Sequence, residues 1–325
     1  MENKAFISII IPIFNKEQYI ERCFNSVVMQ VYKNIECIIV DDCSTDNSFE
    51  IIDRLIKNYK GDIKFRLIRC EKNGGPGPSS AKNTAIDIAN GEYLFFFDVD
   101  DEITENCINA LVALVKKYPG VDMVQGGIKH TDYLIFKDKL PEFVNGNQKI
   151  KKKYYWYIPV PTWNKLVRKE FIINNNLYFK KGLVHEDEHW KFFLLKNIRS
   201  LASTNEDTYI YHTVPNSVMT NQNLFPSIST CLTIAEDMLS NLDVDILEQQ
   251  LLHTCDLLNV QKKRITSDEK YTSLMPRCEE LLAKMPGGTF FLKLTVRETG
   301  RAIKAIVRGV FGEKTLLNLK KLLRK

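Results

Sequence analysis

The sequence lacks the residue patterns of several common classes of protein. Its eight cysteines include no CxxC pair, and its five histidines form no cluster at the spacing of zinc ligands. No run approaches the ~20 consecutive apolar residues of a transmembrane helix. The apolar start FISIIIPIF is interrupted by Pro12 and followed by no small-residue cleavage site, which disfavours a signal peptide. The sequence therefore predicts free, reduced thiols in a cytoplasmic protein without membrane-spanning helices.

A strong overall charge is also missing. The net charge is +5 over 325 residues, but residues 289–325 hold ten Lys/Arg and only two acids. The preceding 288 residues therefore carry a net charge of −3, which excludes a basic nucleic-acid-binding surface as the main feature of the body. A hydrophobic content of 44% is ample for a large core.

The first hundred residues alternate short apolar runs with amphipathic segments. Strands are predicted at ISIIIPIF (7–14), IECIIV (35–40), FRLIRC (65–70) and YLFFFDVD (93–100). Helices are predicted at 16–30, at FEIIDRLIKNY (49–59), at 81–90 and at 105–117. This order predicts a doubly wound α/β fold, with a mostly parallel nucleotide-binding sheet flanked by helices. After residue 220 the pattern becomes helical.

Polar clusters follow three of these strands, namely FNKE, DDCSTD and DVDD. Because ligands of open α/β sheets bind beyond the carboxyl ends of the strands, the three clusters are expected to meet at one rim. The first strand is not followed by GxGxxG, which disfavours a nicotinamide or flavin cofactor. The rim therefore predicts a different nucleotide ligand.

The acidic cluster DVDD (98–101) suits a divalent cation. In a continuing strand Asp98 and Asp100 share a face, and neighbouring carboxylates raise each other's pKa unless a cation neutralises them. Mg²⁺ and Mn²⁺ are commonly held by one or two carboxylates together with substrate phosphates. The alternative is a solvated turn that caps the next helix.

Five motifs occur in an order that resembles a known family. The segment from IIIPIFNKEQ to VDDCSTDNS, a loop ending in AKN, GEYLFFFDVDD, WNKL (163–166) and HEDE (185–188) are similar to the inverting family 2 glycosyltransferases of GT-A fold. The resemblance covers residues 6–215, about two-thirds of the chain. It departs from the usual pattern at Lys82, where arginine is common, and at Cys43, where glycine is common.

The resemblance implies a role for each matched residue. Asp187, with Glu186 beside it, is the expected base that takes the proton from the acceptor hydroxyl. Asp100 and His212 are the expected ligands of Mn²⁺ or Mg²⁺. Trp163, Asn164 and Asp101 are expected near the sugar and acceptor. The expected contacts of the donor nucleotide are Pro12, Phe14, Asn15, Glu17, Asp41, Lys82 and Asp98.

Each of these residues also has a structural alternative. Glu186 and Asp187 could be the charged first turn of a helix, and Asp41 could belong to a helix-capping turn. Trp163 could be a core residue, and a lone histidine such as His212 is more often structural than a metal ligand.

Three regions are predicted along the chain. Residues 1–215 form the GT-A catalytic domain, 216–288 a helical region and 289–325 a basic amphipathic tail. The tail favours contact with an anionic membrane surface at the inner face of the cell membrane, and the alternative is a helix packed on the body.

The predicted function is glycosyl transfer. The expected donor is a nucleotide-diphosphate sugar of the UDP class, and the expected acceptor is a hydroxyl of a polysaccharide or lipid-linked oligosaccharide. Two alternatives remain open. One is a sugar-1-phosphate nucleotidyltransferase, although FNKEQ is not its glycine- and lysine/arginine-rich loop. The other is a non-catalytic subunit that binds a sugar nucleotide.

Overall fold

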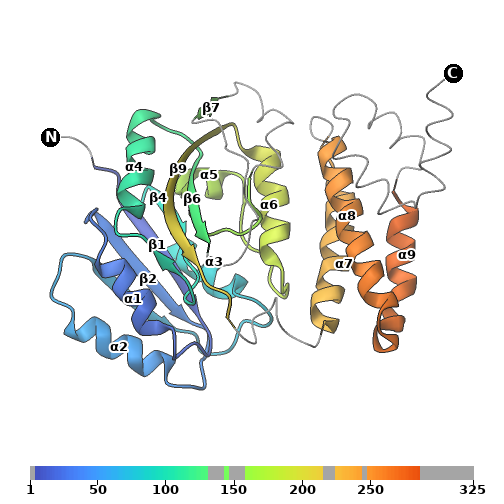
Figure 1. Cartoon of the computed structure of the whole chain (residues 1–325), viewed down its shortest axis with the longest axis horizontal. Coiled ribbons are helices and arrows are strands. Elements are labelled where there is room, and N and C mark those ends of the chain that lie inside the picture. Colours follow the sequence, from blue (N-terminus) through green and yellow to red (C-terminus); the bar gives the residue numbers. More distant parts are fainter. Residues whose placement is uncertain (1–3, 131–142, 146–157, 215–223, 244–246, 286–325) are drawn as a thin grey trace. The chain divides into compact units, whose positions relative to one another are not determined.

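A computed structural model describes residues 4–130, 143–145, 158–214, 224–243 and 247–285. Figure 1 shows the chain and its element labels. The chain divides into two compact units, residues 1–230 and 231–325. The predicted basic tail, 289–325, lies outside the described residues.

The amino-terminal half of the sheet is parallel, as the sequence predicts. Its strands in spatial order are β3 (Lys64–Arg69), β2 (Ile35–Asp41), β1 (Ile7–Ile13) and β4 (Tyr93–Phe96). β2 is buried along its whole length and β1 at all but one position, which explains why both read as apolar runs without alternation.

Three helices connect these strands, and a fourth comes after β4 in the chain. They are α1 (Ile20–Val28), α2 (Ser48–Asn58), α3 (Ser79–Ile88) and α4 (Cys107–Lys117). α1 packs on α2, and α3 packs on β1 and β2. Alternate residues Ile7, Ile9, Ile11 and Ile13 face the core that includes α1 and α4. The predicted helices are confirmed, but α1 is shorter than 16–30 because Asn15 has a left-handed backbone (φ 51°) and the chain turns before Ile20.

The prediction that a strand continues through Asp100 is wrong. β4 ends at Phe96, and the chain then turns, with the Asp101 amide donating to the Asp98 carbonyl oxygen (3.1 Å). The preceding phenylalanines alternate as expected: Phe96 packs on Trp190, while Phe97 packs on Tyr209 on the other face. Asp98 and Asp100 are therefore displayed by a turn rather than by strand alternation.

The carboxyl-terminal half makes the sheet mixed. Beyond β4 the order continues with β8 (Lys165–Arg168), β6 (Met123–His130), β9 (Ser200–Tyr211) and β5 (Glu102–Ile103), and β7 (Phe143–Asn145) also pairs with β9. β8 is antiparallel to both neighbours, whereas β6 and β9 are parallel. Two helices belong to this half, α5 (Lys169–Asn174) and α6 (Glu186–Asn197).

The carboxyl-terminal region is helical, as predicted. It contains α7 (Phe225–Ser240), α8 (Leu247–Thr266), the 3-10 helix η2 (Glu269–Leu274) and α9 (Met275–Ala283). Within it α8 packs on η2 and α9. In the described part of the chain, no helix has both the length and the apolar character needed to cross a bilayer. All eight cysteines lie in described residues, and none of them is part of a disulfide bond.

Candidate active site

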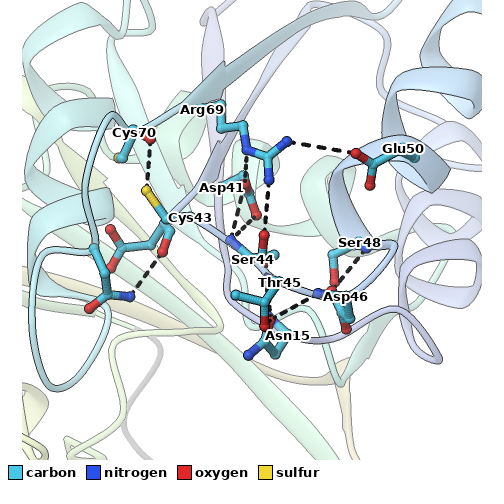
Figure 2. Close-up of polar contacts among 12 residues, drawn as sticks. Asn15, Asp41, Cys43, Ser44, Thr45, Asp46, Ser48, Glu50, Arg69 and Cys70 are labelled. Carbon is cyan, nitrogen blue, oxygen red and sulfur yellow. Dashed lines mark hydrogen bonds and ion pairs between the residues drawn. The ribbon is translucent and has the colours of Figure 1, made fainter.

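The loops that follow β1 and β2 are tied together by side-chain hydrogen bonds (Figure 2). Asn15 Oδ1 accepts from the Thr45 amide (2.8 Å), and Ser44 Oγ accepts from the Asn15 amide (2.9 Å). The left-handed backbone of Asn15 turns its amide toward the second loop, a conformation that asparagine adopts more readily than most residues. Asn15 therefore shapes the rim through its bonds to the second loop.

The next residues continue this connection. The Glu17 amide donates to Asp46 Oδ2 (3.0 Å), and Glu17 Oε2 accepts from the side-chain amide of Asn47 (2.8 Å). Pro12 lies in β1, while Phe14 beside it is 47% exposed. The rim thus presents one uncovered aromatic ring, Phe14, on a loop whose backbone is held by its neighbours.

Asp41 ends β2 and is fully buried. Figure 2 shows its polar contacts. Its carboxylate accepts from the Ser44 amide (3.3 Å) and pairs with Arg69 Nε (3.3 Å). Arg69 also donates to the Ser44 carbonyl oxygen (2.9 Å) and lies 3.7 Å from the Glu50 carboxylate. Asp41 is thus bonded to protein groups at the end of β2, and its expected contact with a base stays a prediction.

Sequence reasoning missed Arg69, although the sequence contained the information needed. Parallel pairing of the second and third strands in register places Asp41 directly opposite Arg69 at the end of both strands. An acidic and a basic residue at paired strand ends are expected to form an ion pair. Arg69 was missed because strand register was not inferred.

Cys43 follows Asp41 closely and occupies the position where the family commonly has glycine. Its backbone is left-handed (φ 62°), the conformation that glycine adopts without steric cost. Its Sγ donates to the Cys70 carbonyl oxygen (2.8 Å), as Figure 2 shows. The turn is therefore kept despite the replacement.

The loop 73–80 approaches the segment before α6. Asp42 Oδ1 accepts from the Gly74 amide (2.9 Å), which fixes one end of this loop to the β2 rim. A Cβ atom on Gly77 would lie only 2.2 Å from the Leu183 carbonyl oxygen, and Gly77 has φ +73°. Glycine is therefore required where the two segments pass each other, immediately before Glu186.

The acidic turn after β4 separates its three carboxylates into different environments. Asp100 is 20% exposed and forms an ion pair with Lys16 Nζ (2.7 Å). Asp101 is buried and accepts from the Tyr209 hydroxyl (2.7 Å) and the His212 amide (2.8 Å). Asp98 is partly exposed.

The pKa values of this turn reflect burial and mutual repulsion. Desolvation by the surrounding protein raises the pKa of the partly exposed Asp98 to about 6; the charge of Lys82 opposes this rise, and the charge of Asp100 adds to it. Burial likewise raises the pKa of Asp101 to about 8, and the charge of Asp98 adds to this. The turn thus brings together carboxyl groups that disfavour each other's ionised form, and a nearby cation would stabilise that ionised form.

The ring of His212 contacts Glu102 instead of the aspartates. His212 Nε2 lies 2.7 Å from Glu102 Oε1, and Arg22 Nε lies 3.6 Å from the same carboxylate oxygen. Only the backbone amide of His212 bonds to the acidic turn, through Asp101. Among the residues that the structure describes, no group of three or more His, Cys, Asp or Glu side chains forms a metal site.

The amino terminus of α6 carries the second acidic cluster. Glu186 is buried and forms an ion pair with the buried Lys82 (2.9 Å). Lys82 Nζ also donates to Thr162 Oγ1 (3.1 Å). Burial alone lowers the pKa of Lys82, but Glu186 and Asp98 outweigh it and the net shift is upward. Lys82 is therefore a charged ammonium that forms an ion pair with Glu186.

Asp187 differs from its neighbour Glu186. It is partly exposed, and Oδ1 accepts from the Glu188 amide (3.0 Å). Although Asp187 is partly exposed, desolvation by the surrounding protein raises its pKa to about 7, and the charges of Glu186 and Glu188 contribute to the rise. A carboxylate with a pKa near neutrality is a much stronger base than an ordinary aspartate.

Trp163 and Asn164 lie beneath the rim in the core. Trp163 is 7% exposed and stacks on Tyr209 with ring centroids 4.4 Å apart. Asn164 is buried, donates to the Gly126 carbonyl oxygen (2.8 Å) and accepts from Thr208 Oγ1 (2.6 Å). Like Asp101, these two side chains pack or bond inside the fold, and their expected contact with a sugar or an acceptor stays a prediction.

Comparison with known proteins identifies the family. Residues 8–176 match the family described as Glycosyl transferase family 2. The chain belongs to this family. It is therefore a glycosyltransferase, and the resemblance seen in its motifs is confirmed.

Several relatives are similar to it. The chain is 31% identical to the glycosyltransferase GlyG of Streptococcus pneumoniae over 66% of this chain and 72% of that protein. It is 27% identical to the poly(ribitol-phosphate) β-N-acetylglucosaminyltransferase TarS of Staphylococcus aureus, over 63% of this chain but only 35% of TarS. The chain thus spans about a third of TarS.

Solved structures agree on the fold. The crystal structure of S. aureus TarS 1–349 in complex with UDP-GlcNAc matches with a TM-score of 0.65 and 20% identity, over 86% of this chain and 82% of that one. A mannosyltransferase of Pyrobaculum calidifontis in complex with GDP-Man and Mn²⁺ matches with a TM-score of 0.55 and 14% identity, over 91% and 89% of the two chains. The predicted GT-A fold is confirmed.

Proposed function

We propose that this enzyme transfers a sugar from a UDP-sugar, with inversion, to a hydroxyl group of a polysaccharide or lipid-linked oligosaccharide, and that Asp187 is its base. TarS, a relative named as an N-acetylglucosaminyltransferase and solved with UDP-GlcNAc, supports a UDP-sugar donor. The observation that carries the proposal is the placement of Asp187, partly exposed in the first turn of α6 next to the buried Lys82–Glu186 ion pair, together with its raised pKa.

Asp187 is suited to deprotonate the acceptor. Its pKa of about 7 leaves a substantial fraction ionised at neutral pH, yet makes the carboxylate basic enough to accept a proton as the hydroxyl attacks the anomeric carbon. Glu186 forms an ion pair with Lys82, and the electrostatic effect of Glu186 contributes to the raised pKa of Asp187. The Lys82–Glu186 pair therefore positions the base and helps to set its pKa.

The rim after β1 and β2 is suited to the nucleotide. Phe14 offers an exposed aromatic face for the base, and Pro12, Asn15 and Glu17 form or tie the surrounding backbone. We assign Asp41 a positioning role through Arg69 and the Ser44 amide, because its carboxylate is fully buried. Asp98, partly exposed beyond β4, remains available to a ribose hydroxyl.

The acidic turn fits a divalent cation. Asp100 is accessible and already pairs with a cation, the ammonium of Lys16, and its charge contributes to the raised pKa of Asp98. We propose that Asp100 would hold Mn²⁺ or Mg²⁺ together with the donor phosphates, as these ions require few carboxylates. The bound ion would stabilise the negative charge of the departing nucleoside diphosphate. The ring of His212 would first have to leave Glu102.

The acceptor and the cellular location remain predictions. A polymer or lipid-linked acceptor is consistent with the poly(ribitol-phosphate) in the name of TarS. Contact with an anionic membrane would rest on residues 289–325, which lie outside the described part of the chain. A cytoplasmic, peripheral location is the corresponding prediction.

A thermal-shift panel of nucleotide sugars with Mn²⁺ tests the donor. A ligand that binds only the folded enzyme raises its melting temperature in proportion to the logarithm of its concentration over Kd. UDP-sugars should raise it in the presence of Mn²⁺, and GDP- or CDP-sugars should not. A selective response to a GDP-sugar would contradict the proposed donor class.

The released products separate the proposal from its alternatives. Slow, metal-dependent release of UDP from a UDP-sugar without acceptor is expected of the transferase. A nucleotidyltransferase would instead form pyrophosphate from UTP and a sugar 1-phosphate. A subunit that only binds sugar nucleotides would show the thermal shift without releasing UDP.

A further inference from the structure

Lys16 has a contact that the donor-binding motifs do not explain. Its ammonium lies 2.7 Å from Asp100 Oδ2, and the two side chains are 28% and 20% exposed. The residues belong to different loops, one after β1 and the other after β4, which are adjacent parallel strands. The ion pair therefore spans the rim at the carboxylate proposed for the metal.

The loop after β1 holds the backbone of Lys16 in place. The Lys16 amide donates to Ser48 Oγ (2.8 Å), and the neighbouring Asn15 and Glu17 are bonded to the second loop as described above. Figure 2 shows Asn15 within this network. The anchored backbone directs the side chain toward Asp100, while its four-carbon stem leaves the ammonium free to move.

Other cations nearby are engaged elsewhere. Arg22 donates to the backbone carbonyl of Asp100 and lies 3.6 Å from Glu102. Lys82 is held by Glu186. In the described part of the chain, Lys16 is thus the side chain that forms an ion pair with the Asp100 carboxylate.

We propose that Lys16 is a place-holder cation: its ammonium competes with the divalent metal for Asp100, and the arriving metal and donor displace it toward the donor phosphates. This inference rests on the proposed metal-dependent use of a UDP-sugar. A metal ion entering alone must break the ion pair and approach a positive charge, whereas a metal ion entering with the donor offers Lys16 new anionic partners. Lys16 thereby couples metal binding to donor binding.

Binding of Mn²⁺ alone, followed by the EPR signal of the free ion, tests the competition. Lys16→Met should bind Mn²⁺ at least roughly tenfold more tightly than the wild type in the absence of donor, because a competing charge is lost. Lys16→Arg, which keeps the charge, should resemble the wild type. Lys33→Met is the matched control, since it removes an exposed lysine that donates to the Val28 carbonyl oxygen, before β2.

Binding of UDP at saturating Mn²⁺ tests the second half of the proposal. Lys16→Met should weaken UDP binding roughly fivefold or more, because a charge-assisted phosphate contact is lost, and Lys33→Met should not. Equal Mn²⁺ affinity in Lys16→Met and the wild type would overturn the place-holder role. Unchanged UDP affinity would overturn the phosphate contact.

Asp100→Asn separates this inference from the proposed function. If Asp100→Asn loses Mn²⁺ binding but Lys16→Met gains no Mn²⁺ affinity, the proposed role of Lys16 is refuted while the metal site stands. Retention of full Mn²⁺ affinity in Asp100→Asn would refute the metal site itself. Melting temperatures of all variants establish that each binding measurement is made on folded protein.

Discussion

The end of β2 and the start of α6 each carry an aspartate at the candidate active site, and the two carboxylates differ in exposure and in the charges around them. Asp41 is fully buried and is neutralised by Arg69 and the Ser44 amide. Asp187 is partly exposed, and desolvation by the surrounding protein, followed by the charges of Glu186 and Glu188, raises its pKa. An aspartate surrounded by donors fixes a loop, whereas one beside other acids remains a base.

The largest expected effect is on catalysis by Asp187→Asn. This variant should bind UDP-sugar normally but lose about 10²- to 10⁴-fold in transfer rate, because positioned bases contribute that much. Donor binding by thermal shift and UDP release measure the two properties separately. Full activity in the variant would remove Asp187 from its assigned role.

Removing the cation between the two acidic clusters should mainly affect stability. Lys82→Met leaves buried Glu186 without its partner and should lower the free energy of unfolding by ~3–5 kcal/mol. Urea denaturation measures this change. The double variant Lys82→Met/Glu186→Gln should recover part of the loss, since the unpaired charge is gone, and failure to recover would point to another cause.

Changing Arg69 tests whether Asp41 acts through its loop. Arg69→Ala should cost ~1–3 kcal/mol of stability, since a buried carboxylate loses a donor. It should raise the KM for the donor more than it lowers kcat, because the loop that carries the nucleotide rim is loosened. Arg69→Lys should restore part of the stability. An equal loss in kcat with unchanged KM would contradict a positioning role.

The smallest effect is expected at an exposed pair on the same half of the fold. Arg54 and Glu21 are 3.3 Å apart with side chains 62% and 64% exposed. Arg54→Ala should change stability by no more than ~1 kcal/mol, as exposed ion pairs contribute little. Arg54→Ala is the matched control for Arg69→Ala. If both variants lose the same free energy of unfolding, burial of the carboxylate partner does not determine how much the ion pair stabilises the fold.

The parallel half of the fold could be predicted from the sequence because its strands are buried on both faces. Continuous apolar runs such as those of β1 and β2 permit few other interpretations, and the polar residues after them mark the ligand-binding rim. The mixed half could not be derived in this way. β9 pairs with β5, β6 and β7, which are distant in sequence, and no local pattern encodes those partners.

The site was predicted less fully than the fold, because exposure depends on long-range packing. Trp163 looked suited to sugar stacking, but its ring stacks on Tyr209 from a strand that follows 37 residues later. Asp101 looked like its neighbour Asp100, yet it is buried against Tyr209 and the His212 amide. The contact between Lys16 and Asp100 likewise requires the adjacency of β1 and β4.

Stability gives an independent check on Asp187. Its pKa in the folded state exceeds the ordinary value of 3.8, so the protonated carboxyl stabilises the fold at low pH, and this contribution is lost as the pH rises through about 7. Asp187→Asn carries no charge to bury. Its melting temperature above pH 7 should therefore equal or exceed that of the wild type, and a marked decrease would contradict the assigned environment.

The pH dependence of metal-activated UDP release tests the basic character of Asp187 most directly. In the wild type the rate should rise tenfold per pH unit at low pH and level off above about pH 7, where the carboxylate is ionised. The residual rate of Asp187→Asn should show no such inflection. A wild-type profile that is flat from pH 5 to 8, or an inflection that persists in Asp187→Asn, would contradict the assignment of Asp187 as the base.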